Sequence, residues 1–215
     1  MKPPRQARSR ATLDRLLEAT AELLAERRFE EATLAELVRR AGSSVGAFYA
    51  RFESKQALLR YFDEQLFKRG RALWEEFLAP ESWRGASAAT IVTRVVARFV
   101  ESRRRHRGLL RSLALYVRSR PAPDFAARAA RLNRFVTRRL ARLLLLRREQ
   151  IGHRDPERAI AFGLLLLDSA TREAILFEKA GLSPGRLTDR DLAAELTRAL
   201  LAYLEIVPEK RGAGR

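Results

Sequence analysis

Residues 33–55 read TLAELVRRAGSSVGAFYARFESK, and this stretch decides the fold of the N-terminal part of the chain. Two short segments with apolar residues at helical spacing flank a small-residue turn at 41–43. Thr33 with a glutamate three residues later is the pattern of a capping box, and Gly42 suits the left-handed position after a helix. The pattern predicts a helix-turn-helix whose second helix begins near Ser44 and enters a DNA groove.

Outside this stretch helical patterns dominate, and no alternating strand pattern is bounded by turn residues. We therefore expect an all-α fold. Residues 1–9 are interpreted as a flexible basic arm that could contact DNA or remain solvated. The expected helices run approximately over 12–27, 33–41, 44–50, 54–79, 88–105, 108–119, 124–149, 155–180 and 188–207.

Composition limits the function classes. The chain has 215 residues, no cysteine and two histidines, so thiolate or histidine metal sites are not expected. Its basic N-terminus lacks the apolar stretch of a signal peptide, and its apolar runs fall short of a membrane span, which favours a cytoplasmic protein. No nucleophile elbow, phosphate-binding glycine loop or HExxH motif is present, so we expect neither an enzyme nor a cofactor.

The positive charge is concentrated in the middle of the chain. The net charge is +17, and residues 94–148 hold seventeen Lys and Arg against two Asp and Glu. Such a run is usually a solvated face. One hypothesis is that four arginines attract an anionic effector, such as an acyl-coenzyme A, or an acidic partner: Arg103, Arg104, Arg105 and Arg107. An alternative function is a charge-driven, nonspecific helical nucleic-acid binder.

The string T-x-x-x-L-V-x-x-A-G-S-S-x-G-A-F-Y-x-x-F-x-S-K resembles the signature of the TetR family of bacterial transcriptional repressors over about residues 12–60. Ser43 stands where the family usually has an apolar turn residue, and Val38 where it usually has alanine. The resemblance implies a three-helix DNA-binding domain at 1–53 and a larger helical effector-binding and dimerisation domain at 54–215. The implied partners are a double-stranded DNA operator, a second copy of the chain and a small-molecule effector.

The resemblance also assigns roles to residues of the motif. Thr33, Tyr49 and Lys55 resemble phosphate-contacting residues, and Arg51 is a further candidate. Val45 and Ala47 could read thymine methyl groups by apolar contact, and a glycine inside a helix suggests close approach of the backbone to DNA or to the bracing helix. The expected DNA-binding set is Thr33, Ser44, Val45, Gly46, Ala47, Tyr49, Ala50, Arg51 and Lys55. The alternative is a helical hairpin without DNA-binding use.

Two closing helices carry small and apolar residues at helical spacing, which predicts a dimer interface; the alternative is that these stripes form the core of one subunit. The interface residues expected are Ala159, Gly163, Leu166, Leu167, Ala170, Ala174, Leu192, Leu196, Leu200 and Tyr203.

Aromatic and polar residues between 54 and 180 are candidates for an effector pocket, although core packing is the simpler explanation for each aromatic residue. Asp168 interrupts an apolar helix, where it could bind a ligand, pair with an arginine across a dimer, or lie exposed. The pocket candidates are Trp74, Phe77, Trp83, Phe99, Tyr116, Asn133, Phe135, Thr137, Phe162 and Asp168.

Overall fold

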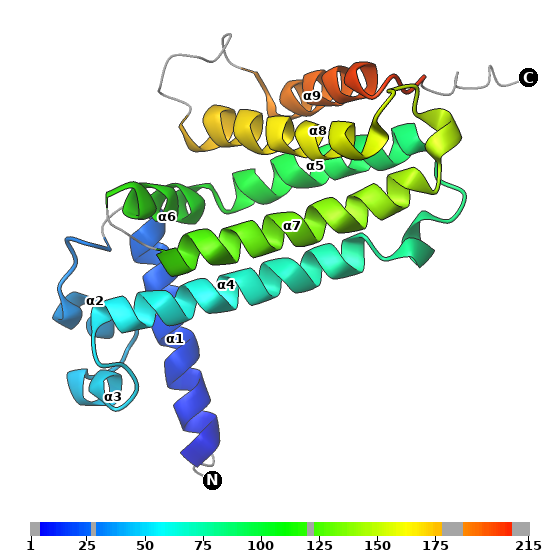
Figure 1. The fold of residues 1–215 in the computed structure, drawn as a ribbon. Coiled ribbons are helices and arrows are strands. Elements are labelled where there is room, and N and C mark those ends of the chain that lie inside the picture. Colours follow the sequence, from blue (N-terminus) through cyan, green and yellow to red (C-terminus); the bar gives the residue numbers. More distant parts are fainter. Residues whose placement is uncertain (1–4, 27–28, 120–122, 178–186, 208–215) are drawn as a thin grey trace, which may run out of the picture. The chain divides into compact units, whose positions relative to one another are not determined.

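The computed structural model describes residues 5–26, 29–119, 123–177 and 187–207, and every regular element in these residues is a helix, as expected (Figure 1). The helices are α1 (Arg5–Ala25), α2 (Leu34–Arg40), α3 (Val45–Tyr49), α4 (Lys55–Phe77), α5 (Ala88–Arg105), α6 (Arg107–Ser119), α7 (Pro123–Leu145), α8 (Pro156–Thr171) and α9 (Asp189–Tyr203). Short 3-10 turns cover η1 (Pro80–Trp83) and η2 (Arg148–Gln150), and a π-helical segment, η3 (Arg172–Leu176), follows α8.

The chain packs as two units. Unit 1 comprises residues 1–69 and 107–129, and unit 2 comprises residues 70–106 and 130–215. Helices α4 and α7 therefore each contribute to both units, so this division by packing differs from the boundary expected after residue 53. The functional boundary between a DNA-binding and an effector-binding domain remains a prediction.

The core of unit 1 joins the N-terminal helices to α6. Leu16 and Leu23 of α1, Leu37 of α2 and Phe48 of α3 are fully buried. A Cβ added at Gly108 of α6 would lie 2.8 Å from the Cα of Ala25, so only glycine allows this close approach of α6 to α1. Helix α6 consequently braces the helix on which the helix-turn-helix rests.

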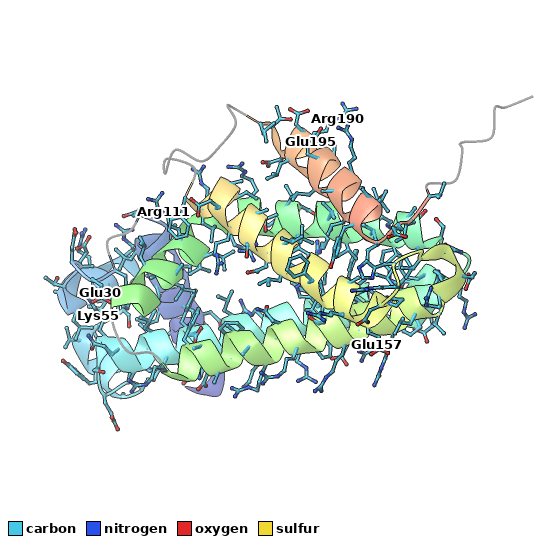
Figure 2. The ribbon with its side chains drawn as sticks, turned by 45° about the horizontal axis from the view of Figure 1, so that its top comes forward. Glu30, Lys55, Arg111, Glu157, Arg190 and Glu195 are labelled. Atoms are coloured by element: carbon cyan, nitrogen blue, oxygen red, sulfur yellow. The ribbon has the colours of Figure 1, made fainter. Side chains whose placement is uncertain are left out.

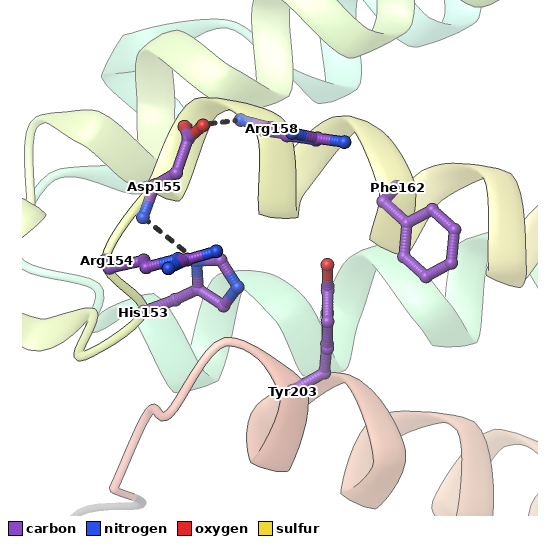
Figure 3. Close-up of a pocket in the computed structure, with 6 residues that line it drawn as sticks. All are labelled: His153, Arg154, Asp155, Arg158, Phe162 and Tyr203. Carbon is purple, nitrogen blue, oxygen red and sulfur yellow. Dashed lines mark hydrogen bonds between the residues drawn. The ribbon is translucent and has the colours of Figure 1, made fainter.

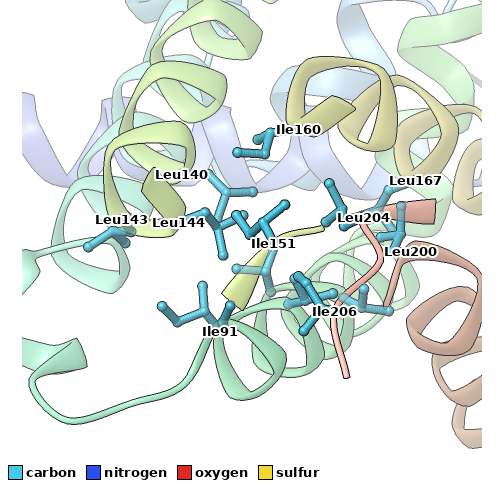
Figure 4. Close-up of a cluster of buried hydrophobic side chains, with 14 of the residues drawn as sticks. Ile91, Leu140, Leu143, Leu144, Ile151, Ile160, Leu167, Leu200, Leu204 and Ile206 are labelled. Carbon is cyan, nitrogen blue, oxygen red and sulfur yellow. The ribbon is translucent and has the colours of Figure 1, made fainter. Parts of the chain in front are cut away.

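The core of unit 2 gathers apolar side chains from α5, α7, α8 and α9 (Figure 4). Ile91, Leu144, Ile151 and Ile160 are essentially inaccessible to solvent. Trp83 is also buried, and its indole N–H donates to the Phe77 carbonyl at 2.7 Å, which satisfies the only polar atom of that side chain.

Local helix signals are confirmed by side-chain caps. The hydroxyl of Thr33 accepts from Glu36 N at 3.1 Å, and the carboxylate of Asp155 accepts from Arg158 N at 3.1 Å, with Pro156 opening α8. Thr188 and Asp191 form a complete capping box at the start of α9, and the hydrogen bonds from the Thr188 hydroxyl and backbone N–H lower the pKa of Asp191.

Several expected boundaries are wrong. Helix α1 begins at Arg5, so residues 5–9 are not a flexible arm, because arginine, glutamine and alanine after the proline pair are good helix formers. Helix α7 ends at Leu145 rather than near 149. Just after this end, the guanidinium of Arg147 binds the carbonyls of Trp83, Ala86 and Leu143. Lys2 and the turn expected at 181–185 lie outside the described residues.

Candidate nucleic-acid interface

Helices α2 and α3 are joined by the turn that the sequence predicts. Gly42 has a φ of +53°, a conformation that costs other residues free energy, and the N–H of Ser43 donates to the Val38 carbonyl at 2.8 Å. Ser44 then caps α3, because its hydroxyl accepts from Ala47 N at 3.1 Å. The Ser43 hydroxyl is buried without a hydrogen-bond partner, which fits a position that usually holds an apolar residue.

Helix α3 has an inner and an outer face. Phe48 is completely buried and packs with the ring of Phe52 at a centroid distance of 5.7 Å. On the outer face Val45 is 43% exposed and Tyr49 is 57% exposed. A Cβ at Gly46 would meet nothing within 4 Å, so the bracing helix does not require glycine there. This outer face presents to solvent the two methyl groups of Val45, the backbone at Gly46 and the phenol of Tyr49.

The remaining residues of the expected DNA-binding set lie around this face. Thr33, Ser44 and Ala50 are exposed, and Ala47 is half-buried. The guanidinium of Arg51 is used structurally: it donates to the Ala47 carbonyl at 2.9 Å, and to the Ser9 hydroxyl and carbonyl at 2.7 and 3.0 Å. Arg51 thus ties the first turns of α1 to the end of α3, a contact that sequence reasoning missed.

Lys55 has a role that the motif did not reveal. Its ammonium donates to the carbonyls of Phe29, Ala32 and Glu30 at 2.5, 2.7 and 3.2 Å, and it lies 4.9 Å from the centre of the Phe29 ring (Figure 2 labels Lys55 beside Glu30). An ammonium has three donors, and these contacts occupy all three. Lys55 therefore holds the chain before α2, and a phosphate contact would have to compete with these carbonyls.

Two arginines orient α2. The Nε of Arg15 donates to the Ala41 carbonyl at 2.9 Å, at the end of α2. Arg40 donates to the carboxylate of Glu26 at 2.6 Å and lies 3.8 Å from Glu36, and the hydrogen bond to Glu26 raises the pKa of Arg40. These contacts fix α2 on α1, and the charge of Arg40 is neutralised by glutamates of the protein.

A buried ion pair reinforces unit 1 behind the helix-turn-helix. Arg128 of α7 donates to Asp63 of α4 at 2.5 Å, and Asp63 is buried. Burial raises the pKa of Asp63, and the hydrogen bond from Arg128 only partly opposes this effect. The second oxygen of Asp63 is buried without a hydrogen-bond partner, which explains why desolvation prevails.

The expected effector residues do not form one group. Trp74 lies 4.8 Å from Phe99 and 5.6 Å from Phe77 between ring centroids, and Phe77 lies 5.3 Å from Trp83. These four rings form an aromatic cluster at the edge of the unit 2 core. Among the other candidates, Asn133 is exposed, the hydroxyl of Thr137 donates to the Asn133 carbonyl, and the side chain of Tyr116 lies outside the described residues.

Asp168 binds an arginine of its own subunit. Its carboxylate pairs with Arg103 of α5. Burial lowers the pKa of Arg103, nearby Arg172 lowers it further, and Asp168 only partly opposes these two effects. Arg104 likewise pairs with Asp189 at 2.7 Å. A pairing of Asp168 across a dimer is therefore not needed to satisfy this carboxylate.

Phe162 lies in a different place, where it lines an open pocket of about 340 Å³ with His153, Arg154, Asp155, Arg158 and Tyr203 (Figure 3). The Phe162 and Tyr203 ring centroids are 5.5 Å apart, and His153 is 5.3 Å from Tyr203. Residues expected in two separate sites, effector pocket and dimer interface, thus meet at one surface.

The expected dimer interface needs correction. Five of its residues are buried in the core of their own subunit, because α8 and α9 pack on each other and on α5: Ala159, Gly163, Leu167, Leu192 and Leu200. A Cβ at Gly163 would lie 3.1 Å from the Leu200 side chain, so this glycine serves packing between α8 and α9. Ala170, Ala174, Leu196 and Tyr203 are half-buried, and Leu166 is exposed together with Phe162 and Leu165.

Two absences apply to the described residues only. No group of three or more His, Cys, Asp or Glu side chains is placed there to hold a metal ion. Within the same residues, no helix combines the length and the apolar character that crossing a membrane requires.

A protein-family model matches the N-terminal part of the chain. Residues 16–62 match the model of the bacterial regulatory proteins of the tetR family. No curated protein matches the sequence.

Solved structures resemble the whole chain. A bacterial regulatory protein in the tetR family from Rhodococcus RHA1 has a TM-score of 0.66 and 18% identity, covering 92% of this chain and 98% of the other. A TetR transcription regulator from Haloarcula marismortui has a TM-score of 0.66 and 16% identity, with 90% and 96% covered. The fatty acid degradation regulator FadR from Bacillus halodurans has a TM-score of 0.64 and 14% identity, with 96% and 100% covered. At these identities the likeness shows the fold.

Proposed function

The chain belongs to the TetR family of DNA-binding transcriptional regulators, and from this premise we propose that it is a repressor that binds a palindromic operator as a homodimer. In this proposal the outer face of α3 reads the major groove. A small molecule bound by unit 2 changes the affinity of the protein for DNA.

The outer face of α3 is the observation that carries the proposal. A helix of five residues exposes Val45 and Tyr49 while a neighbouring phenylalanine is completely buried. The exposed parts of these two side chains are not needed by the core, whereas an apolar contact and a phenol hydroxyl suit thymine methyl groups and phosphates. The bare backbone at Gly46 allows the helix to approach a groove closely.

Exposed apolar residues on α8 support dimerisation. Phe162, Leu165 and Leu166 lie at spacings of three and four on one helix and are 44%, 58% and 42% exposed. We propose that this surface, named the α8 apolar face after these three residues, pairs with the same face of a second subunit. Two DNA-reading helices would then meet successive major grooves.

Effector binding is supported by the fold and by one relative. The printed name of the Bacillus halodurans structure calls that protein a fatty acid degradation regulator. By analogy we propose that unit 2 binds an effector beside the aromatic cluster of Trp74, Phe77 and Phe99. Ligand screening by thermal shift tests which small molecules bind to this region of unit 2.

Selection of bound fragments from random duplex DNA tests this function. We expect enrichment of an inverted repeat whose half-sites are separated by one helical turn, about 10–10.5 base pairs, or by a multiple of that distance. Val45→Asp should abolish the enrichment without unfolding the protein, because the side chain is exposed. Leu146→Asp is the matched control, since it places the same charge at an apolar residue that is 72% exposed outside unit 1. Recovery of unselected sequences by the wild type would contradict the proposal.

A further inference from the structure

The arginine excess of residues 94–148 divides into two groups in the structure. Several members have partners that lie outside the segment or on the protein backbone: Arg103 with Asp168, Arg104 with Asp189, Arg128 with Asp63, Arg139 with Glu75, and Arg147 with main-chain carbonyls. The interpretation of the segment as a solvated face therefore fails for this group, because acidic residues far away in sequence pair with most of these arginines.

A second group lies together on α7. Arg131, Arg134, Arg138 and Arg142 are all exposed. Among the contacts of the described residues, none of these four guanidiniums has a hydrogen bond, an ion pair or an aromatic ring. We name these four residues the α7 ridge.

The α7 ridge is one-sided and straight. At 3.6 residues per turn the four positions fall within an arc of about 80° around the helix axis. Eleven residues separate the first from the last, so the ridge is about 16 Å long at 1.5 Å per residue. Four unneutralised charges on one line make a surface that attracts a polyanion.

The side chains around the ridge argue against a protein partner. Protein interfaces can include arginines, but their centres rely on apolar and aromatic anchors. The only aromatic residue within residues 131–142 is Phe135, and its ring is already covered by Arg71 and Arg139 at 4.7 and 5.4 Å. The ridge therefore offers charge without an apolar anchor.

We propose that the α7 ridge binds the phosphate backbone of double-stranded DNA without reading its sequence. One strand of duplex DNA carries a phosphate every 3.4 Å of helix axis, so a ridge of about 16 Å lies beside roughly five phosphates. This contact adds to operator recognition by α3 and does not depend on it. Its contribution is affinity for any duplex, with a steep dependence on salt.

The test compares two double variants of the full chain. Arg134→Gln/Arg138→Gln removes two ridge charges, and Arg84→Gln/Arg190→Gln removes two charges from other exposed sites of unit 2. Glutamine preserves helix propensity, and both variants should melt at the wild-type temperature. The probe is a fluorescent 30-base-pair duplex of random sequence, titrated by anisotropy between 50 and 200 mM NaCl.

We expect the ridge variant to reduce the slope of log affinity against log salt by about 2, since each lost phosphate contact contributes about 0.9. The control variant should keep the wild-type slope. Equal slopes in both variants would overturn the proposal. Polyglutamate of the same charge, used as a competitor, tests an acidic protein partner: if it binds the wild type as tightly as the duplex does, the assignment to DNA is overturned. Failure of the operator selection with a ridge effect intact would refute the proposed repressor function alone.

Discussion

At the scale of one residue, the proposed role of Tyr49 in DNA binding can be tested separately from its contribution to folding. Its phenol is more than half exposed, although the ring edge touches buried Phe48 at a centroid distance of 5.5 Å. The ring thus belongs to the fold, while the hydroxyl is free for a phosphate.

Tyr49→Phe should raise the dissociation constant for any duplex by about five- to tenfold, the equivalent of one hydrogen bond of about 1 kcal/mol. The melting temperature should not change. Tyr61→Phe deletes the same atom from a half-buried tyrosine of α4 and is the control. A lower melting temperature in Tyr49→Phe, with normal DNA affinity, would contradict the assignment.

Lys55 is expected to behave in the opposite way. Lys55→Met keeps the length of the side chain but deletes the charged contacts with the carbonyls of residues 29–32. We expect the free energy of unfolding to fall by about 1.5–3 kcal/mol, measured by urea denaturation, because hydrogen bonds from a charged donor are lost. Unchanged stability combined with weaker DNA binding would show instead that the ammonium serves a phosphate.

Asp63 gives unit 1 an unusual pH dependence. Its pKa is raised in the folded state by burial, so the folded protein binds this proton more tightly than the unfolded chain does. The contribution of Asp63 to stability is therefore fully present below the unfolded pKa and is lost as the pH rises through the folded pKa.

Asp63→Asn should change the free energy of unfolding by less than about 1 kcal/mol near neutral pH, because the amide mimics the neutral acid that the folded protein favours and can still accept a hydrogen bond from Arg128. Between pH 7 and pH 4 the stability advantage of the wild type over the variant should grow, as measured by denaturation at each pH. A shrinking advantage would mean that Arg128 dominates and that the pKa is lowered. Arg128→Leu leaves the carboxylate buried without its donor and should lower the free energy of unfolding by on the order of 3 kcal/mol near neutral pH. Asp63→Leu/Arg128→Leu should recover most of that loss, since no charge remains buried alone.

At the scale of the element, α3 is short and would not hold its shape alone. Its serine cap, the positive φ of Gly42 before it and the burial of Phe48 supply the order that its few internal hydrogen bonds do not. Glycine at position 46 weakens this helix, and a Cβ there would meet nothing within 4 Å.

Gly46→Ala should therefore leave the protein folded and increase its free energy of unfolding by a few tenths to about 1 kcal/mol. It should weaken operator binding, because the added methyl group projects from the face that approaches DNA. Gly108→Ala is the contrasting variant: its methyl would collide with Ala25 and destabilise the protein by about 1–3 kcal/mol. Wild-type DNA affinity in Gly46→Ala would remove the need for close backbone approach.

At the scale of the whole molecule, the α8 apolar face decides whether two reading helices can act together. Residues first expected at the interface, such as Ala159 and Leu167, are inaccessible in one subunit. The exposed residues beside them remain as the surface on which the proposed dimer depends.

Leu165→Glu should shift the protein from dimer to monomer in sedimentation analysis, because a charge at an apolar interface is desolvated without a partner. Affinity for a palindromic operator should fall by at least a hundredfold, while affinity for random duplex changes little. Leu146→Glu is the control, since this leucine is exposed but lies outside α8. A dimeric Leu165→Glu variant would exclude the α8 apolar face as the interface.

The sequence alone was sufficient for the all-α class, the turn at Gly42 and the cap at Thr33. These features depend on hydrogen bonds between residues three to five positions apart, so a short stretch of sequence contains the whole interaction. The order of the helices followed from periodicity for the same reason. Helix α7 ended earlier than expected, and Arg147 just after it binds the carbonyl of Leu143 together with those of Trp83 and Ala86, which lie far away in sequence.

Only the tertiary structure decided what each helix face meets. Periodicity shows that Leu166 and Leu167 belong to apolar stripes, but it does not show which of the two leucines is covered by α9 and α5. It likewise could not show that the ammonium of Lys55 faces carbonyls more than twenty residues away, or that Asp63 and Asp168 neutralise particular arginines while the α7 ridge stays unpaired. Contacts over such separations arise from packing of whole helices, and packing is a property that no local window of sequence contains.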